Sequence, residues 1–188
     1  MPTFTVVAGA NGAGKSTLTR FGREGFQECA VLDPDAVARS MQRLGVRSAS
    51  PIDAGRSVLE MAKGYLKSRS SFLIETTLSG NTYLHMMARA KALGYLVVLL
   101  YVGTADVSIN IQRVKIRVLK GGHDVPLEDQ LRRYPRSIVN LRKALEIADE
   151  AIVFDNSTPK GHTKVAVKDT RGFEIFEPVP EWAAFLRS

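Results

Sequence analysis

The sequence predicts an α/β fold in three layers, with helices on both faces of a mostly parallel five-stranded sheet and a β-hairpin after it. Three observations support this prediction. Short apolar runs of strand length alternate with longer segments of helical periodicity. The run Tyr95–Val102 is apolar throughout, which is typical of a parallel strand covered on both faces. A glycine-rich segment at residues 9–14 joins the first apolar run directly to a helical segment.

The first half of the chain contains the first three predicted strands. They are expected at Thr3–Ala8, Ala30–Leu32 and Ser71–Glu75. Helices are expected at Lys15–Arg23, from Pro34 to about Leu44 and from Pro51 to about Ser68. Asp33 and Ser50 each precede a proline, and this pair of residue types marks a helix start because proline fits the first helical position.

The second half continues the alternation. Ser79-Gly80-Asn81 opens a helix that should end at Gly94, before the strand Tyr95–Val102. We expect Thr104 to cap a helix that reaches about Lys120, and Gly121–Pro126 to be a flexible connection. Leu127–Ala148 is mostly helical, although Pro135 should kink or break that helix. The fifth strand is expected at Ala151–Phe154.

The C-terminal tail has a different pattern. Lys164–Lys168 and Phe173–Phe176 alternate in polarity around Asp169–Gly172, which predicts a β-hairpin. Glu181–Arg187 should form a short closing helix. No repeat, low-complexity tract or linker interrupts the chain, so residues 1–188 are expected to form one domain.

Composition narrows the class of protein. Apolar residues make up 45% of the chain and charged residues 24%, as in soluble globular proteins. No apolar run approaches the ~20 residues of a membrane span, and the N-terminus lacks the features of a signal peptide. The single cysteine, Cys29, excludes an internal disulfide, so a cytoplasmic location is expected. A net charge of +7 suits a nucleotide, a phosphosugar, a nucleic acid or an acidic protein, but also a merely solvated surface.

The glycine-rich segment matches the phosphate-binding loop pattern G-x-x-x-x-G-K-[ST] at every fixed position. Its glycines let backbone N–H groups turn toward phosphate oxygens, and the helix that follows favours negative charge. The nucleotide-binding residues predicted from the pattern are Gly9, Ala10, Asn11, Gly12, Ala13, Gly14, Lys15, Ser16 and Thr17. Lys15 can bridge the terminal phosphates, and the Ser16 hydroxyl can ligate Mg²⁺. The sequence therefore predicts a P-loop NTPase fold that binds a nucleoside triphosphate.

Polar residues follow the predicted strands, where the ligands of open α/β sheets bind. Asp33 and Asp35 follow the second strand, Glu75 and Thr77 follow the third, and Asp155, Asn156 and Ser157 follow the fifth. Carboxylates there can accept the proton of an attacking hydroxyl, hold Mg²⁺ or orient the second substrate. Helix capping by Asp33 or Asp35 and a structural ion pair at Glu75 are the alternatives.

Residues 113–143 form a basic stretch with the glycine-containing connection inside it. Its cations are Arg113, Lys115, Arg117, Lys120, Arg132, Arg133, Arg136, Arg142 and Lys143. This layout suits a lid at about residues 113–137 that closes over the triphosphate and supplies Arg117, Arg133 and Arg136 to the transition state. A solvated helical face is the alternative. Tyr134 is the one aromatic residue inside the stretch, so nucleic-acid binding is less favoured.

The chain resembles zeta toxin–type kinases of bacterial toxin–antitoxin systems. The resemblance extends from the phosphate loop to about Ser157. It rests on Gly9–Thr17, Leu32–Asp35, Ile74–Leu78, Gly121–Pro126, Arg132–Ser137 and Phe154–Ser157. It implies ATP-dependent phosphorylation of the sugar 3′-hydroxyl of UDP-N-acetylglucosamine. It also implies that Lys15 acts on the transferred phosphate, Asp35 is the general base, and Glu75 and Thr77 hold the UDP-sugar. An antitoxin partner is expected by the same resemblance.

Two other functions are compatible with the sequence. A kinase of the same fold could act on a nucleic-acid end or another metabolite, as the net charge of +7 and the arginine-rich stretch suggest. Alternatively, the chain could be an ATP-binding switch or interaction module with little turnover. The segment after Asn156 has no evident counterpart in the family.

Overall fold

The computed structural model describes residues 1–21, 29–43 and 51–187. Its strands are β1 (Thr3–Ala8), β2 (Ala30–Leu32), β3 (Phe72–Thr76), β4 (Leu96–Gly103), β5 (Glu150–Asp155), β6 (Thr163–Asp169) and β7 (Gly172–Ile175). Its helices are α1 (Lys15–Phe21), α2 (Pro34–Arg43), α3 (Pro51–Ser68), α4 (Thr82–Ala92), α5 (Val107–Leu119), α6 (Leu127–Ile147) and the 3₁₀ segment η2 (Glu181–Arg187). The predicted ends of the first two helices, at Arg23 and Leu44, fall outside the described residues.

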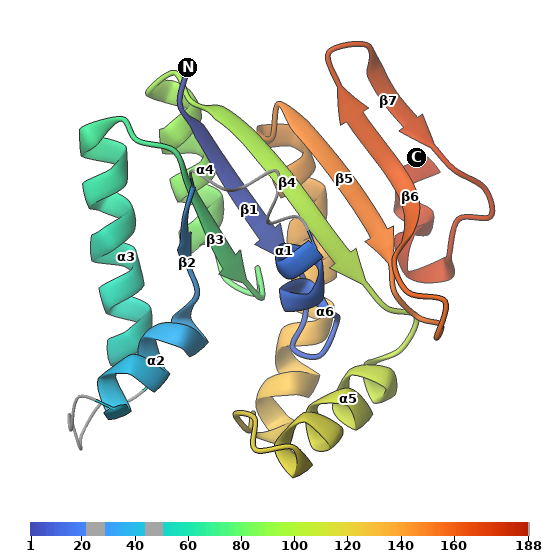
Figure 1. The fold of residues 1–188 in the computed structure, drawn as a ribbon. Coiled ribbons are helices and arrows are strands. Elements are labelled where there is room, and N and C mark those ends of the chain that lie inside the picture. Colours follow the sequence, from blue (N-terminus) through green and yellow to red (C-terminus); the bar gives the residue numbers. More distant parts are fainter. Residues whose placement is uncertain (22–28, 44–50, 188) are drawn as a thin grey trace.

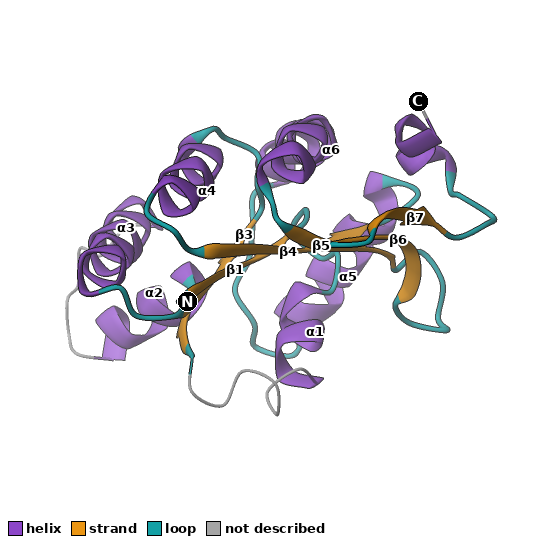
Figure 2. Cartoon of the chain, turned by 90° about the horizontal axis from the view of Figure 1, so that it is seen from above, coloured by secondary structure: helices purple, strands orange, loops and turns teal. Residues whose placement is uncertain are grey.

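The sheet has seven strands in the order β2-β3-β1-β4-β5-β6-β7 (Figure 1). The first five pair in parallel, with α4 and α6 on one face and α1 and α5 on the other (Figure 2). The predicted α/β/α class and parallel sheet are thus confirmed. The predicted hairpin forms, but β6 pairs antiparallel with β5 and extends the sheet from five strands to seven. This pairing satisfies backbone groups that would be exposed if β5 were an edge strand.

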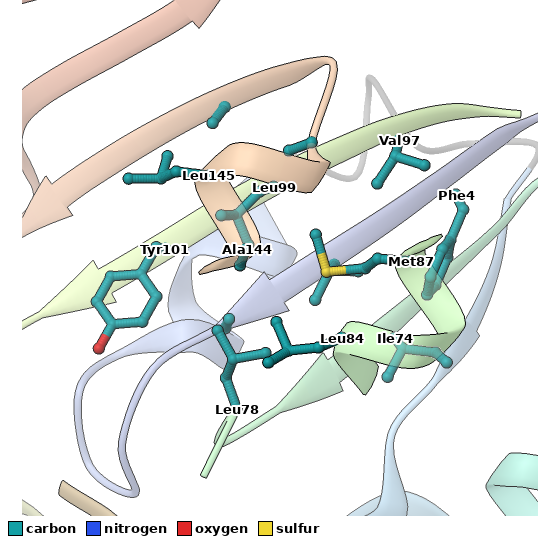
Figure 3. Packing of buried hydrophobic residues seen from close by; sticks show 14 of the residues in the cluster. Phe4, Ile74, Leu78, Leu84, Met87, Val97, Leu99, Tyr101, Ala144 and Leu145 are labelled. Carbon is teal, nitrogen blue, oxygen red and sulfur yellow. The ribbon is translucent and has the colours of Figure 1, made fainter. Parts of the chain in front are cut away.

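The core lies between the sheet and the helices of one face (Figure 3). Phe4, Leu99 and Met87 are fully buried there, and Phe4 stacks on Phe72 with ring centroids 4.5 Å apart. Tyr101 is also buried, and its hydroxyl lies 3.0 Å from Ser137 Oγ of α6. Because β1 and β4 are covered on both faces, they hold the loops at their carboxyl ends rigidly in place.

Two local predictions need correction. The N-cap of α5 is Asp106, whose carboxylate accepts a hydrogen bond from Ser108 N at 2.7 Å, whereas Thr104 is buried and bonds to Asn110. The helix α6 continues through Pro135 without a break. Pro135 is exposed, so the carbonyl that loses its helical donor can bond to water. The predicted short closing helix is confirmed, and it is the 3₁₀ helix η2.

Among residues 1–21, 29–43 and 51–187, no helix has both the length and the apolar character needed to cross a membrane.

Candidate active site

The phosphate loop follows β1 and curls back on itself before α1. Gly9, Gly12 and Gly14 have φ values of +141°, +77° and +109°, which side chains rarely adopt. A Cβ on Gly9 would lie 2.2 Å from the carbonyl oxygen of Val102, and one on Gly12 would lie 2.5 Å from that of Asn110. The glycines are therefore required both by backbone conformation and by the close approach of β4 and α5.

The side chain of Lys15 turns back to the start of the loop. Its Nζ donates hydrogen bonds to the carbonyl oxygens of Gly9 at 2.8 Å and Ala10 at 3.0 Å. The ammonium group therefore sits beside the curled backbone, where an anion in the loop would be within its reach.

Ser16 and Glu75 meet at the edge of the loop. Ser16 Oγ donates to Glu75 Oε2 at 3.0 Å, and Glu75 is only 7% exposed. Parallel pairing of β1 with β3 places Val7 opposite Glu75, so the carboxylate lies one strand away from the start of the loop. A hydroxyl oxygen and a carboxylate oxygen beside a phosphate site are suitable ligands for Mg²⁺. This ion usually binds one or two protein oxygens together with phosphates and water.

The other residues predicted after strands lie at the same edge of the sheet. Asp33 directly precedes α2, and its carbonyl oxygen accepts from Val37 N at 3.0 Å, as expected of a residue at a helix start. Asp35 lies in the first turn of α2, and its side chain falls outside the described part of the structure. Thr77 follows β3, with its Oγ1 3.0 Å from Ser79 Oγ.

A side chain of α6 holds the segment after β3 in place. Leu78 is fully buried and has a φ of +54°, an uncommon conformation for a non-glycine residue. Its carbonyl oxygen accepts a 2.9 Å hydrogen bond from Asn140 Nδ2. The backbone next to Thr77 is therefore held in a strained conformation by a buried side chain of another element.

The three predicted lid arginines have different surroundings. Arg133 Nη1 lies 3.4 Å from Asn11 Oδ1 in the phosphate loop, while its Nη2 bonds to Asp129 at 2.8 Å. Arg117 is directed to the connection after α5, where its Nη2 donates to the His123 carbonyl at 2.6 Å. Arg136 is exposed on α6. Of the three, Arg133 is the one whose observed hydrogen bonds reach the loop.

Two asparagines hold the loop backbone by hydrogen bonds. Neither is among the predicted site residues. Asn110 of α5 donates to the carbonyl oxygen of Asn11 at 2.9 Å, and Asn156 donates to that of Ala13 at 2.7 Å. Both side chains are buried. The sequence places Asn156 among the polar residues that follow the fifth strand, whereas Asn110 carries no comparable signal within its helix.

His162 also lies close to the loop, and the charge of Arg113 acts on it. A Cβ on Gly14 would lie 3.2 Å from His162 Nε2, and His162 makes an edge contact with Phe154. Burial lowers the pKa of His162, the Arg113 charge acts in the same direction, and the Gly14 backbone opposes them. Arg113 Nη1 and His162 Nε2 are buried without a hydrogen bond of ordinary geometry. A polar ligand beside Gly14 could satisfy His162 Nε2.

The comparisons with known proteins agree with this geometry. The Zeta toxin family profile matches residues 1–165. An uncharacterized protein of Haemophilus influenzae is 41% identical over 115 residues, which are 61% of this chain and 80% of that protein.

Solved structures of other proteins share the fold. A crystal structure of AvrRxo1-ORF1:-ORF2 with ATP superposes at a TM-score of 0.74 and 15% identity, and it covers all of this chain and 63% of that chain. The chain thus spans less than two thirds of that relative. A structure of the PezAT chromosomal toxin–antitoxin system of Streptococcus pneumoniae has a TM-score of 0.64 at 18% identity, covering 89% of this chain and 72% of that chain.

The family profile covers most of the chain, and the curled loop, the Lys15 and Ser16 positions and the parallel sheet are those of a P-loop fold. The predicted resemblance is confirmed: the chain belongs to the zeta toxin family of P-loop kinases.

Proposed function

We propose that this protein transfers the γ-phosphoryl group of Mg-ATP to the sugar 3′-hydroxyl of UDP-N-acetylglucosamine. The observation that supports phosphoryl transfer best is the contact between Ser16 of the phosphate loop and the buried Glu75 of β3. It brings a hydroxyl and a carboxylate, both suitable ligands for Mg²⁺, together beside a loop shaped for phosphates. The acceptor is carried over from the family resemblance.

On the donor side, residues 9–17 bind the phosphates through backbone N–H groups, and Lys15 balances the charge of the terminal phosphate. Ser16, with Glu75 beside it, would hold Mg²⁺, which when bound neutralises charge on the phosphates. Arg133, whose Nη1 lies 3.4 Å from Asn11 Oδ1 of the loop, adds positive charge beside the transferred phosphoryl group. Arg117 and Arg136 belong to the same proposed lid, residues 113–137, and reach the phosphates only if it closes.

On the acceptor side, Asp33, Asp35, Glu75 and Thr77 form the proposed binding edge. The acceptor oxygen attacks the γ-phosphorus, the bond from that phosphorus to the β–γ bridging oxygen breaks, and ADP leaves. The hydroxyl proton passes to the carboxylate of Asp35, the proposed general base. We place this reaction in the cytoplasm, where ATP and the nucleotide sugar are both present.

The test is phosphate transfer from γ-labelled ATP to a panel of acceptors. We expect labelled UDP-N-acetylglucosamine with the unaltered protein, and none with Lys15→Ala. Labelling of this acceptor that does not exceed the Lys15→Ala background would exclude it. Selective labelling of an oligonucleotide end would instead support the alternative kinase suggested by the +7 charge. ATP binding without transfer to any acceptor would support a low-turnover switch.

An antitoxin partner forms part of the proposal. The PezAT structure is described as a toxin–antitoxin system, and the AvrRxo1 structure contains a second protein, ORF2. A net charge of +7 suits an acidic antitoxin for this chain. We therefore expect the unaltered chain to arrest growth when it is expressed alone. Co-expression of an acidic protein encoded next to it should relieve this arrest, and the Lys15→Ala variant should cause none.

A further inference from the structure

Trp182 of η2 is attached to the carboxyl ends of β4 and β5, and β4 is the direct neighbour of β1, the strand that leads into the phosphate loop. It is 9% exposed, and its Nε1 donates a 2.8 Å hydrogen bond to Asp155 Oδ1 at the end of β5. Its ring lies so close to Gly103 that a Cβ there would be 2.3 Å from two ring carbons. Tyr101 lies on the same strand as Gly103, with its ring centroid 6.0 Å from that of Trp182. The indole is therefore fixed by both packing and a charged acceptor.

Asp155 transmits this attachment to the turn that follows it. Its carboxylate accepts from Ser157 Oγ at 2.6 Å and from Ser157 N at 3.2 Å. Ser157 Oγ in turn accepts from Ala105 N at 2.8 Å. These hydrogen bonds fix the backbone of residues 155–157, because the carboxylate of Asp155 at the start of the turn binds Ser157 at its end.

Asn156 lies between these two residues and contacts the phosphate loop. Its Nδ2 donates to the Ala13 carbonyl at 2.7 Å, and a Cβ on Gly14 would lie 2.3 Å from the same nitrogen. A small shift of the turn would thus move a donor that supports the loop backbone directly. Trp182, Asp155, Asn156 and Ala13 form one continuous set of contacts.

We propose that Trp182 is a positioning residue for the nucleotide site, acting through Asp155 and Asn156 on the phosphate loop. Trp182 lies beyond residue 165, where the match to the family profile ends, so this chain supplies the support from its own C-terminal segment. The inference rests on the proposed binding of ATP to the loop. Trp182 is also the single tryptophan of the sequence, so its fluorescence reports on this position alone.

The first experiment titrates the unaltered protein with Mg-ATP and follows tryptophan emission and calorimetric heat in parallel. Phosphates bound in the loop should change the emission because Asn156 and Asp155 connect the loop to the indole, and the change should saturate with the calorimetric Kd. Heat of binding with unchanged emission would overturn the role of Trp182 and leave ATP binding intact. No binding by either method would overturn both.

The second experiment uses Trp182→Phe, which keeps a ring against Gly103 and removes the indole N–H. We expect the KM for ATP to rise about three- to tenfold while kcat stays within about twofold, because a hydrogen bond to a carboxylate is lost outside the reacting atoms. Phe185→Leu is the matched control: Phe185 lies in η2 against Arg142 and should leave this KM unchanged. An unaltered KM in Trp182→Phe would refute the proposal.

A double variant separates positioning from general loss of stability. If Trp182 acts through Asp155, then Asp155→Ala combined with Trp182→Phe should raise the KM for ATP no further than Asp155→Ala alone. Multiplied effects of the two changes would show that Trp182 acts by another route, and would also overturn the proposal.

Discussion

Ser16 Oγ lies 3.0 Å from Glu75 Oε2, although the two residues are 59 positions apart in the sequence. The contact exists because β1 and β3 are parallel neighbours whose carboxyl ends coincide. Ser16, recognised from the loop pattern, thus meets Glu75, a carboxylate predicted from its place at the end of a strand and from the family resemblance.

Glu75→Gln should weaken the apparent affinity for Mg²⁺ by about 10- to 100-fold, because the amide keeps the shape of the side chain but not its charge. The measurement is phosphoryl transfer as a function of Mg²⁺ concentration at saturating ATP. Glu60→Gln, an exposed change beside Lys63 on α3, is the control and should leave the curve unchanged. Coincident curves for Glu75→Gln and the unaltered protein would contradict a metal-site role.

Arg133→Ala should lower kcat by about 10²- to 10³-fold, since a preorganised donor beside the transferred phosphate is lost. Arg132→Ala is a closely matched control: Arg132 also pairs with Asp129, but it is more exposed and no observed hydrogen bond links it to the loop. Steady-state kinetics at saturating ATP should separate the two variants. Equal effects of the two changes would assign the loss to Asp129 or to α6 rather than to the phosphate contact.

Gly14→Ala should abolish ATP binding and lower the melting temperature. The φ of +109° disfavours any side chain, and the new Cβ would lie 2.3 Å from Asn156 Nδ2. The same change at Gly64, an exposed position in α3 with open space around it, should stabilise the protein by about 0.5–1 kcal/mol. Calorimetric titration and thermal unfolding test the pair. Retained ATP binding in Gly14→Ala would contradict the observed loop geometry.

Acidification should destabilise the protein through His162. Burial lowers the pKa of His162 from its ordinary 6.5, so the folded state binds fewer protons than the unfolded state. Its stabilising contribution is complete above about pH 6.5 and falls as the pH drops through the lower folded value. Urea unfolding at pH 7.5 and 5.5 should show a smaller loss of stability for His162→Gln than for the unaltered protein. Equal losses would place the responsible groups elsewhere.

Much of the fold follows from local rules in the sequence. The parallel strands, the helix start at Asp33-Pro34 and the hairpin at β6 and β7 were predicted because strand alternation, proline geometry and turn residues act over a few positions. The predicted cap at Thr104 and the predicted break at Pro135 were wrong, because the surroundings of these residues in the fold override the local pattern. Thr104 bonds to Asn110 instead of capping, and exposed Pro135 leaves α6 unbroken.

The sequence by itself determined the phosphate loop, because its glycines and Lys15 follow from steric and electrostatic needs within nine residues. Tertiary structure decided what surrounds the loop. Asn110 and Asn156 bind it from 99 and 143 positions away, and among the predicted arginines Arg133 is the one observed to reach it. Such contacts depend on strand order, register and helix packing, which no local pattern encodes.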